Sequence, residues 1–161
     1  MGAWHYQDKP VEGGTRNIVE VASVLPLAVG TLELKPARLR FTDDPVWGYE
    51  CALELGSGDF HCPVGCRVSW LVDDREALEV AASRPDAEPP RLSLDEARHR
   101  WFELRDARLL TVQFKGKDHR LHKAMFDVAD LDRGRLDWDR QRYAELYWQE
   151  HENALRAAAK P

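Results

Sequence analysis

The sequence predicts an α+β protein that is mainly β, built as an antiparallel sheet or as a sandwich of hairpins. Three observations support this class: period-two alternation of apolar and polar residues recurs along the chain, turn signals separate the alternating runs, and two segments have helical spacing instead. A chain of 161 residues is long enough for one domain with a core. We assign residues 1–138 to a single β-rich domain, and residues 139–161 to a helical extension that packs on it or serves as an interface.

Short strands are expected first. Residues 4–7 alternate, and residues 17–25 are rich in β-branched side chains. Two further runs, residues 31–35 and 37–41, also alternate, and Pro36 between them favours a sheet edge or a break.

The clearest strand signal is in residues 47–55, where every odd position is apolar and the even positions are Gly, Glu or Ala. A two-residue turn at Gly58 and Asp59 would fold this strand back on residues 62–70 as a hairpin. That register places Cys51 opposite Cys66 and keeps all three cysteines on the buried face.

Helical and strand signals alternate in the second half. A proline-rich loop covers residues 83–91, and Ser93 with Glu96 then forms a capping box that predicts a packed helix at about residues 93–105. A second hairpin is expected from residues 109–114 and 121–128. A glycine-free segment then predicts a C-terminal helix at about residues 139–159.

Several short motifs resemble a family of small bacterial exported domains of unassigned function. The quoted residues are Trp4, LELK (32–35), GDFHC (58–62), CRV (66–68), the acidic turn 73–74, WFELRDARLL (101–110) and FDVADL (126–131). The resemblance covers about residues 3–138. It implies a mainly β domain with one helix, a periplasmic or secreted setting and a Cys62–Cys66 disulfide, but no activity. The insert between these cysteines is shorter here than in the family, and the tail helix lies outside the resemblance.

The residues themselves leave the cysteine pairing open. In an undisturbed strand Cys62 and Cys66 lie about 13 Å apart, whereas a disulfide needs Cα atoms within about 7 Å. A bulge at Pro63 and Gly65 would bring them together, a regular hairpin would favour Cys51–Cys66 instead, and all three thiols could be reduced. A zinc site is a further alternative, formed by the pairs Cys62, Cys66 and His119, His122.

Catalytic signals are weak. Ser57 lacks a strand–turn–helix context and is interpreted as a turn serine. Glu50 and Glu54 share the polar face of one strand, where a glycosidase-like pair is conceivable but surface carboxylates are the ordinary interpretation. We expect no cofactor. The sequence therefore favours a non-enzymatic binding or structural module of unidentified ligand, with a metal protein or enzyme using the Cys/His cluster as the alternative.

Partners and compartment follow from the same features. The net charge of −5 argues against a nucleic-acid binder, and the absence of a long apolar run argues against a membrane span. Tyr143, Tyr147 and Trp148 suit a protein contact through the tail helix, which would make the chain an interaction module of the cytosol. We expect a periplasmic or secreted protein if a signal peptide precedes the chain, and a cytoplasmic one otherwise. The oligomeric state is left open.

Overall fold

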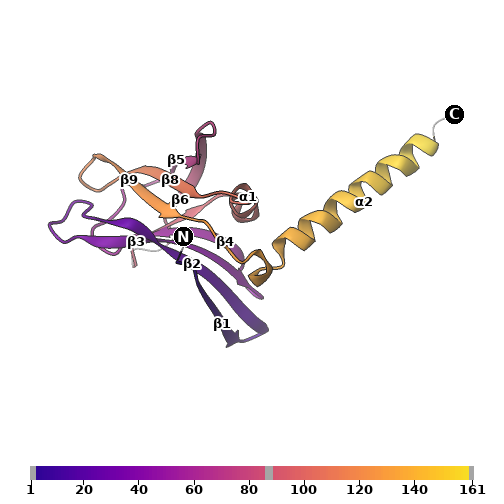
Figure 1. The fold of residues 1–161 in the computed structure, drawn as a ribbon, viewed down its shortest axis with the longest axis horizontal. Coiled ribbons are helices and arrows are strands. Elements are labelled where there is room, and N and C mark those ends of the chain that lie inside the picture. The colour runs from indigo at the N-terminus through magenta and orange to yellow at the C-terminus, as the bar shows by residue number, and fades with distance from the viewer. Residues whose placement is uncertain (1–2, 86–88, 160–161) are drawn as a thin grey trace. The chain divides into compact units, whose positions relative to one another are not determined.

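The computed structural model describes residues 3–85 and 89–159, and its architecture is mainly β, with a nine-stranded antiparallel sheet, a short helix and a long C-terminal helix (Figure 1). The predicted fold class is thereby confirmed. The chain divides into two compact units, Met1–Leu131 and Asp132–Pro161, which are described separately.

The first unit contains all the strands. They are β1 (His5–Val11), β2 (Gly14–Leu27), β3 (Lys35–Asp44), β4 (Gly48–Glu54), β5 (Cys66–Val72), β6 (Leu78–Ser83), β7 (Arg91–Leu94), β8 (Leu109–Lys115) and β9 (Leu121–Asp127). Their order in the sheet is β1-β2-β3-β4-β7-β6-β5-β8-β9, and every pairing is antiparallel.

The sheet bends over its own apolar face. Strand β9 lies beside β2, although the two are far apart in the hydrogen-bonded order (Figure 1). Alternate residues of each strand therefore meet in one core, and the largest fully buried side chains of this unit include Leu39, Phe41, Leu53, Trp70, Trp101, Leu110, Phe114 and Phe126. The ring of Trp101, from the short helix, meets that of Phe41 edge-on at 5.2 Å.

The second predicted hairpin is present as β8 and β9. Leu110 lies opposite Phe126 and Val112 opposite Ala124, and all four are buried. Here the local alternation and the tight connection both specify the same pairing, so the sequence alone identified it.

The predicted central hairpin is wrong. Strand β4 pairs with β3 and β7, whereas β5 pairs with β6 and β8, so Cys51 faces Phe41 and Leu94 rather than Cys66. The intervening loop instead runs along other segments: Gly58 forms a bridge with Val29, and Phe60 with Gly116. Alternation had identified the two strands and their buried core positions, such as Leu53 and Trp70, but it contains no information on which strand is the neighbour.

Two other boundaries differ from prediction. Ser93 lies in β7, and helix α1 spans only Ala97–Glu103; its N-cap is Glu96 in a left-handed conformation (φ 55°), without a side-chain capping bond. The capping-box prediction is therefore wrong, because strand pairing to β4 takes up Ser93. Residues 31–34 are not a strand, and the strand predicted after Pro36 begins at Lys35.

The second unit consists of a 3₁₀ turn, η1 (Arg133–Arg135), and helix α2 (Trp138–Ala158). Arg133 donates to Asp139 through Nε and Nη2, each at 2.7 Å. Leu136 and Trp138 are buried, whereas the described side chains beyond residue 141 are exposed. Across the part of the chain that the structure describes, no helix is both long and apolar enough to cross a membrane.

Candidate functional site

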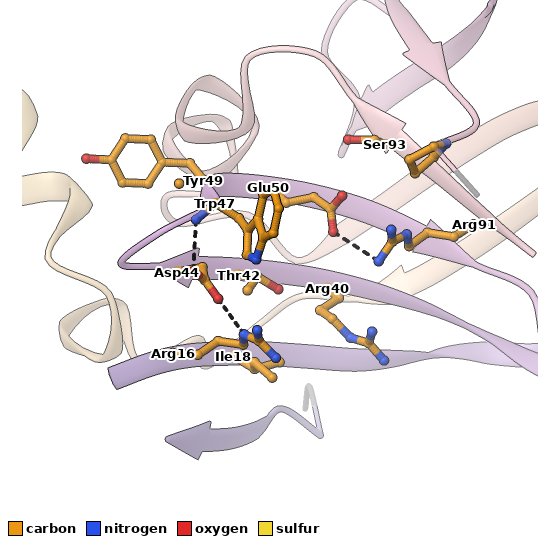
Figure 2. A pocket seen from close by; sticks show the side chains of 12 residues that line it. Arg16, Ile18, Arg40, Thr42, Asp44, Trp47, Tyr49, Glu50, Arg91 and Ser93 are labelled. Carbon is orange, nitrogen blue, oxygen red and sulfur yellow. Dashed lines mark hydrogen bonds and ion pairs between the residues drawn. The ribbon is translucent and has the colours of Figure 1, made fainter. Parts of the chain in front are cut away.

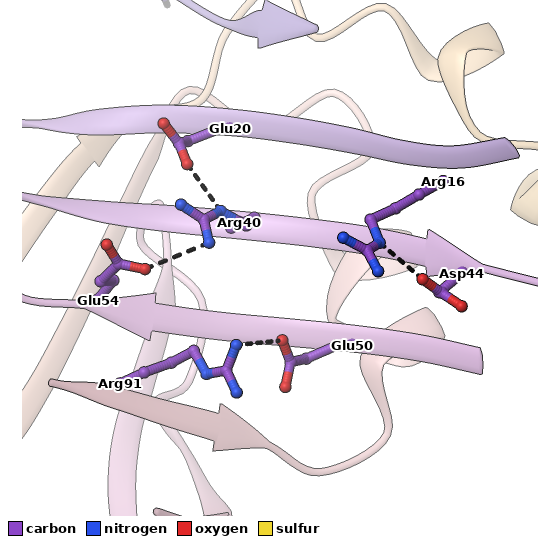
Figure 3. Close-up of polar contacts among 7 residues, drawn as sticks. All are labelled: Arg16, Glu20, Arg40, Asp44, Glu50, Glu54 and Arg91. Carbon is purple, nitrogen blue, oxygen red and sulfur yellow. Dashed lines mark hydrogen bonds and ion pairs between the residues drawn. The ribbon is translucent and has the colours of Figure 1, made fainter. Parts of the chain in front are cut away.

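The polar face of four adjacent strands in the first unit carries a network of ion pairs. Strands β2, β3, β4 and β7 bury one set of alternate residues and direct the other set outward. We call the charged members of the outward set the charged face; they are Arg16, Glu20, Arg38, Arg40, Asp44, Glu50, Glu54 and Arg91, of which Figure 3 shows all but Arg38. Four arginines and four carboxylates make its formal charge zero.

Ion pairs connect these strands from one side to the other. The Nε of Arg40 donates to Glu20 at 2.8 Å, and its Nη1 lies 3.2 Å from Glu54 (Figure 3). The Nη1 of Arg91 lies 3.5 Å from Glu50 on the next strand. Arg40 is directly opposite Glu20 in the register, whereas its pair with Glu54 is diagonal. Each arginine is thus held by a carboxylate of a neighbouring strand, which restricts its rotamers.

Asp44 fixes the end of this network. Its carboxylate accepts the backbone N–H groups of Trp47 and Val46, at 2.9 and 2.8 Å, and the Nε of Arg16 at 2.6 Å. These bonds stabilise the ionised form and hold the pKa of the Asp44 carboxyl below its usual range, with the Trp47 amide as the largest cause. The same carboxylate therefore positions the guanidinium of Arg16 and closes the turn between β3 and β4.

A groove of about 770 Å³ lies on this face. It is lined by Arg16, Ile18, Arg40, Thr42, Asp44, Trp47, Gly48, Tyr49, Glu50, Pro85, Arg91 and Ser93 (Figure 2). The strand register explains the hollow, because Arg40 is followed across the sheet by Ala52 and Ser93, whose side chains are small. Long arginine side chains therefore project beside two small side chains, and this difference in length forms the groove.

Two aromatic residues border the groove. Trp47, in the turn before β4, is 84% exposed, although the predicted hairpin had placed it on the buried face. Tyr49 is 45% exposed, and the guanidinium of Arg98 lies 4.7 Å from the centre of its ring. An indole with this exposure offers a ligand an apolar face at the edge of a polar site.

The cysteines form a structural bond. Cys62 and Cys66 are joined, with their Cα atoms 5.2 Å apart, so the pairing implied by the family resemblance is present and the alternative Cys51–Cys66 is wrong. Gly65, at a φ of 92°, gives the turn that brings the two together. Cys51 is a free, fully buried thiol whose pKa is raised by desolvation, and such a thiol is unreactive.

The structure does not bring the proposed zinc ligands together as a metal site. The sulfurs of Cys62 and Cys66 are bonded to each other, and His122 pairs with Asp118 at 2.9 Å. The ring of His119 lies against that of His61, with 4.4 Å between centroids. In the described ranges, no group of three or more His, Cys, Asp or Glu side chains is arranged to hold a metal ion.

Other residues singled out in the sequence occupy separate places. Ser57 is buried, with its hydroxyl 2.5 Å from that of Thr31. Glu50 and Glu54 belong to the charged face and are paired with arginines. Trp148 is 61% exposed on α2. Tyr143 and Tyr147 also belong to α2, but their side chains lie outside the described part of the structure.

Sequence reasoning missed the groove itself. Its signal was present as Arg38 and Arg40 at alternate positions of β3 and as Glu50 and Glu54 on one face of β4, but only the glutamates were considered, and they were interpreted as surface carboxylates. Only the sheet order places Arg91, some forty residues away in the chain, beside them.

Comparison of the chain with protein-family models, with curated proteins and with solved structures gives no match in any of the three.

Proposed function

We propose that this protein is a non-enzymatic binding module and that the groove on the polar face of β2, β3, β4 and β7 is its ligand site. One observation carries the proposal: arginines and carboxylates that are held by ion pairs line the groove, together with the exposed indole of Trp47 (Figure 2). Ligand sites usually combine a concave surface with a few fixed polar groups.

The protonation chemistry of the groove favours binding over catalysis. A general acid or base works best with a pKa near the operating pH. Hydrogen bonds instead hold the pKa of Asp44 below its usual range, and Glu50 is paired with Arg91. These carboxylates act as fixed acceptors and as anchors for arginine.

The test is a ligand screen in which binding is detected through the NMR signals of residues that line the groove. We expect a ¹⁵N-labelled sample, titrated with a library of saccharides, acidic peptides, nucleotides and amines, to show shifts in the arginine Nε–H signals of Arg16 and Arg40 and the amide of Ser93. The Arg40→Ala variant should lose those responses and keep its spectrum elsewhere. A screen in which every hit maps away from the groove, or in which nothing binds, would contradict the proposed function.

We further propose that the protein works in an oxidising compartment, as the resemblance to exported domains implies. The Cys62–Cys66 bond supports this, because disulfides persist mainly outside the cytosol. Titration with a thiol reagent should find one thiol per chain, Cys51, in unreduced protein isolated from its native source and then denatured. The native protein should show none, because Cys51 is fully buried. Three thiols in the denatured sample would contradict export.

A second candidate function is self-association through α2. Trp148 and Leu155 lie seven residues apart, and therefore on the same face of this helix, where they are 61% and 59% exposed. Sedimentation velocity over a range of concentrations should show a dimer that Trp148→Glu abolishes. A wild-type chain that stays monomeric throughout would exclude this role.

A further inference from the structure

We infer that the groove takes a short oligosaccharide. This inference names the ligand of the site and therefore rests on the binding role proposed above. Three features of the groove point to this class: the balance of its donors and acceptors, the planar shape of its polar groups, and the exposed indole at its edge.

The charge balance comes first. The groove is lined by three arginines and two carboxylates, Asp44 and Glu50, and each of Arg16, Arg40 and Arg91 lies within 2.6–3.5 Å of a carboxylate of the charged face. A site for an anion instead concentrates unopposed positive charge. A phosphate or carboxylate entering this groove would meet Asp44 and Glu50 as well as the arginines, and their repulsion would oppose binding.

Hydroxyl groups fit the same arrangement without conflict. Each hydroxyl both donates and accepts, so it can bond a guanidinium and a carboxylate at once. Arg16 uses its Nε for Asp44, and the rest of its planar fork can donate to two neighbouring hydroxyls of one sugar ring. The carboxylate of Glu50 has two acceptor oxygens, which can accept hydrogen bonds from sugar hydroxyls. The ion pairs hold these groups in place before the ligand arrives, which lowers the entropy cost of binding.

The aromatic edge supplies the other half of the recognition. A sugar ring has an apolar face made of C–H groups, and an exposed indole removes that face from water when the two stack. Trp47 is 84% exposed and lines the groove together with the arginines, so one ligand can contact both kinds of group (Figure 2).

The dimensions favour a chain of sugars over a single ring. The charged face crosses four neighbouring strands, which corresponds to about 14 Å at roughly 4.8 Å per strand. The groove volume of about 770 Å³ lies in the range of sites for extended small ligands. A single sugar ring would fill only part of this space.

The test uses the whole 161-residue chain and named probes. Chitotriose, cellotriose and maltotriose are titrated into ¹⁵N-labelled protein, alongside inorganic phosphate and a polyglutamate peptide. At least one trisaccharide should bind and shift the Trp47 indole and Arg40 Nε–H signals. Trp47→Ala should weaken that binding roughly threefold to tenfold. Arg40→Lys keeps the charge but loses the planar fork, and should weaken it about tenfold.

The controls separate binding from folding. Leu121→Ala truncates an exposed apolar side chain of β9, outside the groove, and should leave saccharide affinity unchanged. Each variant must keep the wild-type midpoint of thermal unfolding within a few degrees; where Arg40→Lys does not, the Trp47→Ala result decides.

Two outcomes would overturn the inference. If phosphate or polyglutamate shifts the groove signals and no trisaccharide does, the saccharide class is wrong while the binding role stands. If no trisaccharide binds and the broad library also leaves the groove signals unchanged, the binding role fails as well.

Discussion

At the scale of single residues, the polar face shows how charged side chains are held partly buried on a sheet. Arg40 is only 24% exposed, yet its guanidinium meets Glu20 on one neighbouring strand and Glu54 on the other. Ala52, directly opposite in the register, is small enough to lie beneath these long side chains, and it is almost fully buried. Pairing across strands therefore offsets the loss of hydration, and the small neighbour leaves room for the groove.

The first prediction concerns Asp44, whose pKa is held below its usual range by two backbone amides and Arg16. In the unfolded chain this carboxyl titrates near pH 3.9, so below that pH the unfolded state binds more protons than the native one. The stability that the ionised group contributes is complete above about pH 4 and is lost as the pH falls further. Asp44→Asn removes this contribution.

Urea unfolding of both proteins from pH 7 down to pH 3 tests this prediction. The wild type should be the more stable at neutral pH, and its advantage over Asp44→Asn should narrow below about pH 4. Two stability curves that run parallel over the whole pH range would contradict it.

At the scale of elements, the connection between β4 and β5 decides the sheet order. Residues 55–65 do not make a tight turn; they run past Val29 at Gly58 and past Gly116 at Phe60. The positive φ of Gly58 is the part of the turn prediction that the structure retains. A side chain at this position would place its Cβ 1.8 Å from the carbonyl oxygen of Val29, so only glycine permits the approach.

The second prediction compares two glycine substitutions. Gly48 and Gly58 both have a positive φ, of 83° and 86°, but a Cβ at Gly48 would meet nothing within 4 Å. Gly48→Ala should therefore lower the free energy of unfolding by about 1–2 kcal/mol, the cost of the left-handed backbone alone. Gly58→Ala should cost about 1–3 kcal/mol more, because Val29 must move. Chemical denaturation measures both, and equal losses would contradict the close approach.

At the scale of the whole molecule, burial is distributed unequally between the two units. The first unit buries apolar residues from all of its strands except β1, whereas Trp138, the first residue of α2, is the one buried residue among those of α2 whose burial is described. A helix whose described side chains beyond residue 141 are all exposed gains little from packing there and relies on its own hydrogen bonds. The stability of the two units should therefore differ.

The third prediction is a gradient of amide protection. Hydrogen exchange measured by mass spectrometry should be fast over residues 144–158 and slow over β4, β5 and β8, since local opening of an exposed helix breaks few tertiary contacts. If α2 self-associates, its protection should rise with protein concentration, while that of β8 stays constant. Protection in the helix equal to that of β8 in dilute samples would contradict the gradient.

The sequence by itself determined the local structure. Alternation identified the buried faces of β8 and β9 and the buried core positions Cys51, Leu53, Val68 and Trp70 of β4 and β5, since period-two patterning reflects burial directly. It also identified the hairpin of β8 and β9, whose strands are adjacent in the chain. The absence of glycine over residues 139–159 predicted α2 almost to its ends.

The tertiary structure decided which strands are neighbours, and with that the candidate site. Any strand with a buried apolar face can pair with several others, so local patterning could not distinguish β5 from β7 as the partner of β4. Pairing with β7 brings Arg91 beside Glu50. It also places Ser93 in a strand, where it lines the groove instead of capping a helix, and Trp47 is exposed. The groove arises from contacts between distant segments, and such contacts leave no local signature in the sequence.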